Sequence, residues 1–251
     1  MGHSMASETR TALWLTALVL VVLTLVKPLG GIPFVGTAAF TIAAVLQLYL
    51  PLWRAGKHDR DYDYVGLHLD TAARDAKNVA LLVVLTFPLY ALGYHLFATR
   101  GHEWVHVLGL GELARFVPER SVESTFGVNG RTLGRELLWL LELAATHVFG
   151  VALPEETFYR GYLQPRLEDH WPARRRWLGV AVGRAAVLTA FFFALGHFLG
   201  EWNPLRMGPF FPALLFAWLR NATGSIAGSI GFHALCNIFG AILFRLYGGY
   251  P

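Results

Sequence analysis

Seven apolar segments divide this chain, and no other feature of the sequence limits its fold more strongly. The apolar segments cover residues 12–26, 32–53, 78–98, 136–153, 178–199, 209–219 and 226–247. Stretches that are polar or contain glycine and proline separate them. Apolar side chains make up 55% of the sequence and charged ones 15%, against about 25% in typical soluble domains. Because a helix needs ~20 apolar residues to cross a bilayer, the sequence predicts an all-α, polytopic membrane helix bundle of about seven (six to eight) transmembrane helices.

The 251 residues are expected to form a single membrane domain. Residues 1–135 would supply N-terminal spans and a long mixed segment, 99–135, and residues 136–247 would form the core that carries the polar motifs. Residues 1–10 are polar and are expected to be disordered or cytoplasmic. Segment 99–135 is interpreted either as an interfacial element that helps to gate or recognise a substrate, or as a solvated loop.

Basic residues indicate which ends of the spans face the cytoplasm. The loop 54–77 and the run Arg174-Arg175-Arg176 hold clusters of such residues, and the positive-inside rule places both in the cytoplasm. Glu155 and His197 each lie about 20 residues from the Arg174 cluster, one before it and one after it. Two helices that leave one cytoplasmic connection would bring both residues to similar depth, nearer the opposite membrane face.

Three polar motifs interrupt the apolar core segments. Ionisable side chains at membrane depth are costly and mark function by default, and residues i and i+4 share one helix face. Glu156 and Arg160 therefore form a candidate ion pair, while Glu155, rotated by about 100°, points elsewhere. The motifs are Glu155-Glu156-x3-Arg160, Phe193-x3-His197 and His233-x3-Asn237.

These motifs, in this order in a polytopic chain, resemble those of the CPBP (CAAX protease and bacteriocin-processing, or ABI) family of intramembrane endopeptidases, related to the type II CAAX prenyl protease. The resemblance covers roughly residues 136–245. It implies that Glu155 is the general base on water, helped by His197, and that His233 and Asn237 stabilise the oxyanion. It also implies that Glu156 and Arg160 form a supporting pair and that Phe193 shapes the pocket.

The resemblance further implies a membrane-anchored protein or peptide substrate, cut near its C-terminus in CAAX-type or bacterial C-terminal sorting-type processing. We expect an integral, multi-pass protein of the bacterial cytoplasmic (inner) membrane, whose partners are that substrate and the lipid bilayer and not nucleic acid. No cofactor is expected. Zinc is the alternative, held by Glu155, His197 and His233, although no His-Glu-x2-His motif is present.

Other interpretations of the same residues stay open. The Glu156–Arg160 pair on its own is also consistent with a helix-stabilising ion pair, each histidine with a hydrogen-bonded core residue, and Asn237 with interhelical hydrogen bonding. The single cysteine, Cys236, is interpreted as a small buried hydrophobe. At the level of the whole chain, the alternatives are a non-proteolytic membrane scaffold or immunity protein and a transporter, although no internal repeat supports a transporter.

Overall fold

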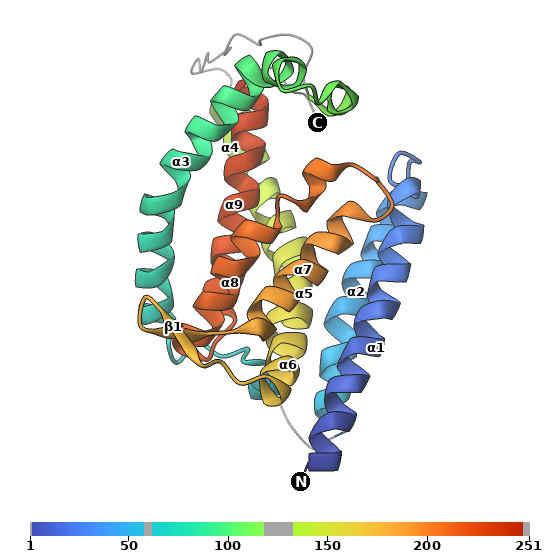
Figure 1. The fold of residues 1–251 in the computed structure, drawn as a ribbon, viewed down its shortest axis with the longest axis vertical. Coiled ribbons are helices and arrows are strands. Elements are labelled where there is room, and N and C mark those ends of the chain that lie inside the picture. Colours follow the sequence, from blue (N-terminus) through green and yellow to red (C-terminus); the bar gives the residue numbers. More distant parts are fainter. Residues whose placement is uncertain (1, 58–61, 118–132, 248–251) are drawn as a thin grey trace. The chain divides into compact units, whose positions relative to one another are not determined.

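Each of the seven apolar segments contains helix in the computed structural model, which describes residues 2–57, 62–117 and 133–247 (Figure 1). The α-helices are α1 (Gly2–Val26), α2 (Val35–Gly56), α3 (Ala72–Val107), α4 (Leu133–Ala145), α5 (Leu153–Glu156), α6 (Gln164–His170), α7 (Arg184–Phe198), α8 (Phe210–Thr223) and α9 (Ala227–Leu246). Two π-helical segments, Thr146–Ala152 and Thr157–Leu163, join α4, α5 and α6. Short 3₁₀ turns occupy Lys27–Leu29, Tyr62–Val65, Gly111–Phe116 and Pro204–Met207.

Within the described residues, five helical stretches are long and apolar enough to cross a membrane. They are Ser7–Leu29, Val35–Gly56, Ala72–Val107, Gly134–His170 and Ala227–Leu246. The helices α7 and α8 have 15 and 14 residues and fall short of the ~20 residues of a full span. The protein is therefore an all-α integral membrane protein, as the sequence predicts.

Several predicted boundaries are wrong. The helix α1 begins at Gly2, so residues 2–10 are helical and not disordered, and the hydroxyl of the buried Thr9 donates to the Arg166 carbonyl at 2.9 Å. The helix α3 continues to Val107, into the segment interpreted as a loop from residue 99. The remainder of that interpretation falls largely on residues 118–132, which lie outside the described residues. Polar residues at helix ends lower the hydropathy of a segment without ending its backbone hydrogen bonds.

A small β-hairpin replaces the expected beginning of the span 178–199. The strands β1 (Arg175–Trp177) and β2 (Val180–Val182) pair antiparallel across Leu178 and Gly179, whose φ angles are 49° and 79°. Two consecutive positive φ angles are typical of a two-residue hairpin turn. The hairpin is fixed to α8, because Trp218 donates to the Trp177 carbonyl at 3.0 Å, so α7 starts only at Arg184.

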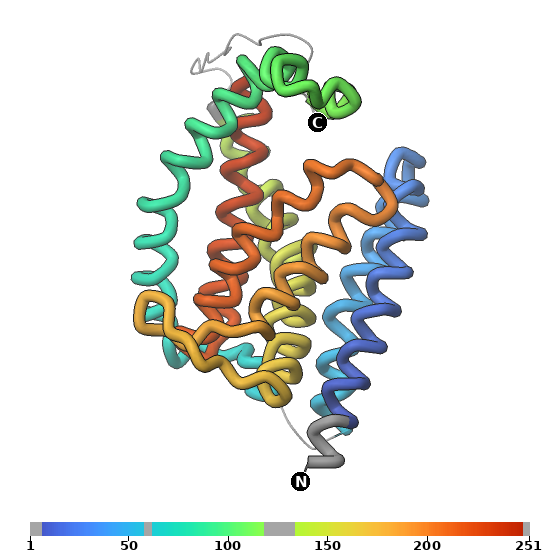
Figure 2. The backbone as a smooth tube through the Cα atoms, viewed as in Figure 1, coloured from blue at the N-terminus to red at the C-terminus, as the bar shows by residue number. Residues whose placement is uncertain are grey.

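The described chain divides into two compact units. The first contains Met1–Val79 and Val148–His233, and the second contains Ala80–His147 and Ala234–Pro251. In the first unit α1 packs against α2, α6 and α7, and α7 packs against α8; the tube of Figure 2 follows α1 and α2 side by side in blue. The first unit therefore brings the N-terminal helices against those that carry the Glu155 and His197 motifs.

The second unit is held together by aromatic and ionic contacts between α3, α4 and α9. Phe87 on α3 stacks on Phe239 of α9 with ring centroids 4.4 Å apart. Glu136 on α4 forms an ion pair with Arg245 of α9 at 2.7 Å. The C-terminal half of α9 therefore contacts both α3 and α4.

Candidate active site

The paired glutamates lie in an unusual stretch of helix. Helical backbone runs from α4 to α6 without a break, and π-helical turns flank the four residues of α5, Leu153–Glu156. Helical backbone continues through Pro154, which follows directly on the first π-helical segment and lies in the first turn of α5. π-Helical turns inside α-helices occur frequently at functional sites, and here they set the directions of Glu155 and Glu156.

The two adjacent carboxylates face different surroundings, as the helical offset predicts. Glu156 is fully buried, and its Oε1 lies 3.1 Å from the Arg160 guanidinium in the expected i,i+4 pair. The same oxygen lies 2.8 Å from Nδ1 of His233 on α9. Glu155 instead has a side chain that is 19% exposed and lines a cavity.

Glu156, Arg160 and His233 form a buried group that we call the Glu156 cluster. Arg160 also donates to the Ala213 carbonyl at 3.1 Å. Its guanidinium carbon lies 4.6 Å from the ring centroid of Phe193 and 5.1 Å from that of Phe216. The His233 ring stacks on Phe216 with centroids 4.9 Å apart. A buried ion pair is acceptable only with such additional partners, so this cluster fixes α5, α8 and α9 at one point.

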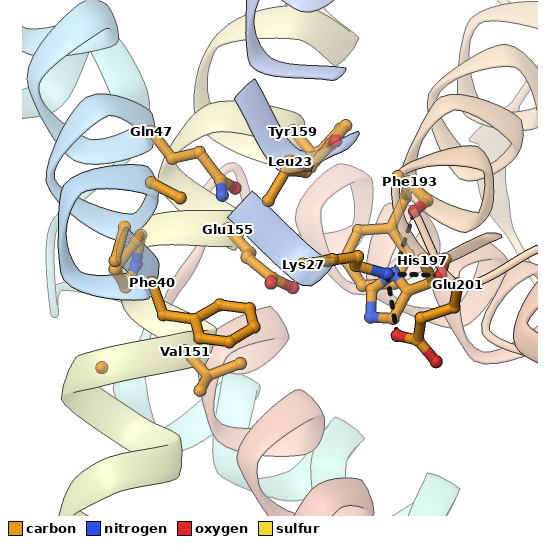
Figure 3. A pocket seen from close by; sticks show the side chains of 15 residues that line it. Leu23, Lys27, Phe40, Gln47, Val151, Glu155, Tyr159, Phe193, His197 and Glu201 are labelled. Carbon is orange, nitrogen blue, oxygen red and sulfur yellow. Dashed lines mark hydrogen bonds and ion pairs between the residues drawn. The ribbon is translucent and has the colours of Figure 1, made fainter. Parts of the chain in front are cut away.

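The cavity has a volume of about 290 Å³ and lies wholly within the first unit (Figure 3). We call it the Glu155 pocket. Its walls come from α1 and the turn after it, α2, the π-helical segments with α5, and α7 with the residue Glu201 beyond it. They are formed by Leu23, Lys27, Phe40, Ala43, Ala44, Gln47, Gly150, Val151, Pro154, Glu155, Tyr159, Phe193, Gly196, His197 and Glu201.

His197 reaches the pocket with a fixed ring orientation. Its Nδ1 lies 3.0 Å from the Phe193 carbonyl one helical turn earlier. A carbonyl oxygen only accepts hydrogen bonds, so Nδ1 carries the proton and a neutral His197 keeps a lone pair on Nε2. The structure therefore brings Glu155, His197 and Phe193 together at one cavity, as expected if they share a site.

A chain of charges borders the same pocket. Lys27 donates to the His197 carbonyl and to Glu201 Oε1, the latter at 3.1 Å, and Arg206 lies 2.5 Å from Glu201 Oε2. Burial raises the pKa of the Glu201 carboxyl, but the Lys27 hydrogen bond and the positive charges of Lys27 and Arg206 outweigh burial and hold its pKa below the ordinary value. These contacts tie the end of α1 to the end of α7.

The sequence interpretation missed Lys27, Gln47 and Glu201. Gln47 is a polar amide inside the second apolar segment, and the argument that polar groups at membrane depth mark function would have selected it. Lys27 and Glu201 lie just beyond apolar segments, where charged residues are common, so no comparable signal identifies them.

His233 and Asn237 are arranged less simply. His233 does not line the Glu155 pocket, but its Nε2 lies 3.8 Å from Glu155 Oε2. Its hydrogen bond to Glu156 was not expected. Asn237 follows one turn later on α9, in the part of the helix that belongs to the second unit. Its role at the site stays a prediction.

The donor set gives little support to a three-ligand zinc site. Among the residues that the structure describes, no group of three or more His, Cys, Asp or Glu side chains is arranged to hold a metal ion. Glu155, His197 and His233 do not form such a group, although Nδ1 of each histidine has a partner and leaves Nε2 directed elsewhere, as in metal-bound histidines. The prediction of a cofactor-free site, with zinc as its alternative, stays a prediction.

Comparison with known proteins yields one finding. Residues 137–239 match the family model described as "Type II CAAX prenyl endopeptidase Rce1-like". No curated protein and no solved structure matches the chain. The matched range contains all three polar motifs, and it leaves out Lys27 and Gln47, which line the pocket from the N-terminal helices.

Proposed function

We propose that this protein, whose residues 137–239 match the type II CAAX prenyl endopeptidase family model, is an intramembrane endopeptidase in which Glu155 activates the attacking water. Its substrates would be membrane-anchored proteins or peptides that are cut near their C-terminus, as in CAAX-type or C-terminal sorting-type processing. The observation that carries the proposal is the convergence of Glu155 and His197 on one largely apolar cavity.

Glu155 is the proposed general base. Its Oε2 is buried and forms no hydrogen bond to any described residue, so it is available to a water molecule. The carboxylate takes a proton as the water oxygen attacks the scissile carbonyl carbon. It then returns that proton to the leaving amine as the C–N bond breaks. The balance of the reaction requires only peptide and water.

His197 is proposed to hold the same water. With Nδ1 donating to the Phe193 carbonyl, the Nε2 lone pair accepts a hydrogen bond from water and leaves a second water proton for Glu155. A fixed orientation of this kind reduces the reorganisation that the reaction requires.

His233 and Asn237 are the proposed oxyanion donors. An ionised Glu156 only accepts, so Nδ1 of His233 donates to it. A hydrogen bond from Nε2 to an oxyanion then requires the imidazolium form, which the Glu156 carboxylate stabilises. Glu156 and Arg160 would act as positioning residues that hold His233.

The proposal is tested by comparing membranes from cells that carry the wild type, Glu155→Gln or Glu142→Gln. Glu142 is an exposed carboxylate on α4 and provides the matched control. C-terminal peptide mass spectrometry is expected to find a set of membrane proteins that keep their tails only with Glu155→Gln. If no tail differs while all three proteins are equally abundant, the proposal fails. The proposed location, a bacterial cytoplasmic membrane, is checked by fractionation of the same cells.

A further inference from the structure

Gln47 is a buried amide whose carbonyl oxygen bonds to none of the described residues. It lies on α2 with 3% of its surface exposed, and it lines the Glu155 pocket. Its Oε1 is buried and forms no hydrogen bond to any residue that the structure describes. An unpaired buried polar group destabilises the folded protein. A residue retained only for packing would be apolar.

Tyr159 presents a second such group to the same cavity. The residue is 2% exposed, its hydroxyl forms no hydrogen bond within the described chain, and it lies one turn after Glu155. Gly196 leaves room beside it, because a Cβ at Gly196 would lie 3.3 Å from the Tyr159 hydroxyl oxygen. An amide and a hydroxyl from two separate helices therefore border the pocket that holds Glu155 (Figure 3).

The chemistry of a peptide main chain fits these two groups. A segment to be cleaved in a membrane must be unwound, and its exposed N–H and C=O groups find no water in the bilayer core. Each such group needs a partner in the protein. The Gln47 carbonyl oxygen accepts from an N–H, and the Tyr159 hydroxyl donates to a C=O.

We propose that Gln47 and Tyr159 form a polar subsite that binds the main-chain amide groups of the substrate next to the scissile bond. The inference rests on the proposed function. It adds a substrate-positioning residue from α2, outside the matched range 137–239. The subsite positions an extended peptide against Glu155, while the apolar walls formed by Leu23, Phe40 and Val151 contact side chains of the substrate.

A second buried glutamine supplies a matched control. Gln164 on α6 is fully buried and its Oε1, like that of Gln47, has no hydrogen-bond partner among the described residues, but it does not line the pocket, and its Nε2 bonds to Asn221 at 2.8 Å and to Glu168 at 3.1 Å. Gln164→Met removes structural hydrogen bonds and is expected to lower the temperature of unfolding. Gln47→Met removes an unpaired amide and is expected to leave that temperature unchanged or to raise it.

The test uses purified protein in lipid vesicles and a farnesylated peptide with a C-terminal CAAX sequence ending in Ser. For Gln47→Met we expect KM to rise about tenfold with little change in kcat, because the subsite binds ground state and transition state alike. Tyr159→Phe is expected to raise KM severalfold. Gln164→Met is expected to leave KM unchanged in the folded fraction.

A second measurement separates the subsite from the reaction. Binding is followed by fluorescence with the same peptide carrying a reduced, uncleavable bond at the scissile position. Gln47→Met should weaken binding about tenfold, and replacing the neighbouring amide N–H by an ester oxygen should weaken binding to wild type but not to Gln47→Met.

The two proposals fail differently. Equal activity of wild type and Glu155→Gln would overturn the proposed function, while weaker binding of the uncleavable peptide to Gln47→Met would still support the subsite. Unchanged binding by Gln47→Met, or no binding by wild type, would overturn the subsite. A loss of thermal stability equal to that of Gln164→Met would assign Gln47 a structural role and would also overturn it.

Discussion

Glu155 and Glu156 are consecutive residues, but the Glu155 pocket and the Glu156 cluster differ in how their polar groups are hydrogen-bonded. In the cluster, Oε1 of Glu156 bonds to both Arg160 and His233, and aromatic rings enclose both partners, although Oε2 of Glu156 and Nε of Arg160 have no hydrogen-bond partner among the described residues. In the pocket, Oε2 of Glu155, Oε1 of Gln47 and the hydroxyl of Tyr159 have no hydrogen-bond partner among the described residues. The bonds in the cluster hold helices together, whereas the unpaired groups of the pocket line a cavity.

The difference has an energetic consequence. Breaking a buried ion pair leaves an uncompensated charge and costs about 3–5 kcal/mol. An unpaired polar group in a cavity already carries its desolvation cost, so its removal changes stability little or favourably. Substitutions in the cluster should therefore lower the free energy of unfolding, and substitutions in the pocket should change the binding or the cleavage of substrate.

Arg160→Met gives the largest expected effect on this comparison. It leaves Glu156 buried with His233 as its remaining hydrogen-bond partner and removes the bond to the Ala213 carbonyl. We expect the free energy of unfolding to fall by about 3–5 kcal/mol, measured by denaturant titration in mixed lipid–detergent micelles. Glu155→Gln, the control, should change it by less than about 1 kcal/mol. Equal losses in both variants would show that the two carboxylates do not differ in this way.

His197→Asn tests the pocket side. The Asn side-chain amide can still donate to the Phe193 carbonyl, as Nδ1 of His197 does, but it lacks a second nitrogen to hold water. We expect kcat for the peptide to fall about a hundredfold, equal to ~2.7 kcal/mol, with an unchanged temperature of unfolding. His170→Asn, at an exposed position on α6, should leave kcat unchanged. A large fall in thermal stability without a fall in kcat would make His197 a structural residue.

The extent to which sequence anticipated this arrangement depends on the range of each contact. The Glu156–Arg160 pair and the shared face of Phe193 and His197 follow from helical spacing, which is local. The bond between His233 and Glu156 joins residues 77 positions apart, and spacing within one helix does not select a partner on another. Gln47 reaches the pocket only because α2 packs against the segment that carries Glu155.

The same limit applies to the fold. Hydropathy located all seven helical segments, because burial in lipid requires apolar length. It did not locate the ends of α1, α3 and α7, because backbone hydrogen bonds continue through polar residues and because the turn at Leu178 and Gly179 begins a hairpin.

Gly196→Ala narrows the pocket without touching the cluster. The added Cβ would lie 3.2 Å from a Leu23 methyl carbon and 3.3 Å from the Tyr159 hydroxyl oxygen, so these neighbours must shift. We expect KM for the peptide to rise about three- to tenfold, or about 0.7–1.4 kcal/mol, with a small loss of stability. Gly93→Ala on α3, where an added Cβ meets nothing within 4 Å, should leave KM unchanged and stabilise its helix slightly. An unchanged KM for Gly196→Ala would mean that substrate does not enter this part of the pocket.

The smallest expected effect concerns the charges at the border of the pocket. The bonds to Lys27 and Arg206 hold the pKa of Glu201 below its ordinary value of 4.5 despite partial burial. A carboxylate with a lowered pKa in the folded state stabilises the protein fully above the pKa of the unfolded chain. This contribution is lost as the pH falls below 4.5 and through the lower folded value. It should amount to no more than about 1 kcal/mol, because the pair is partly exposed and screened.

The measurement is the temperature of unfolding of the wild type between about pH 6 and about pH 3, a range that includes this pKa. That temperature should fall as the pH is lowered, and Glu201→Gln should reduce the fall. The exposed Glu112, exchanged in the same way, should leave the fall unchanged. Lys27 also bonds to the His197 carbonyl, so these charges could influence the pocket. A change in the KM of the peptide in Glu201→Gln would show that the border charges and the pocket are coupled. A change in stability alone would show that Lys27, Glu201 and Arg206 have a structural role, like the Glu156 cluster.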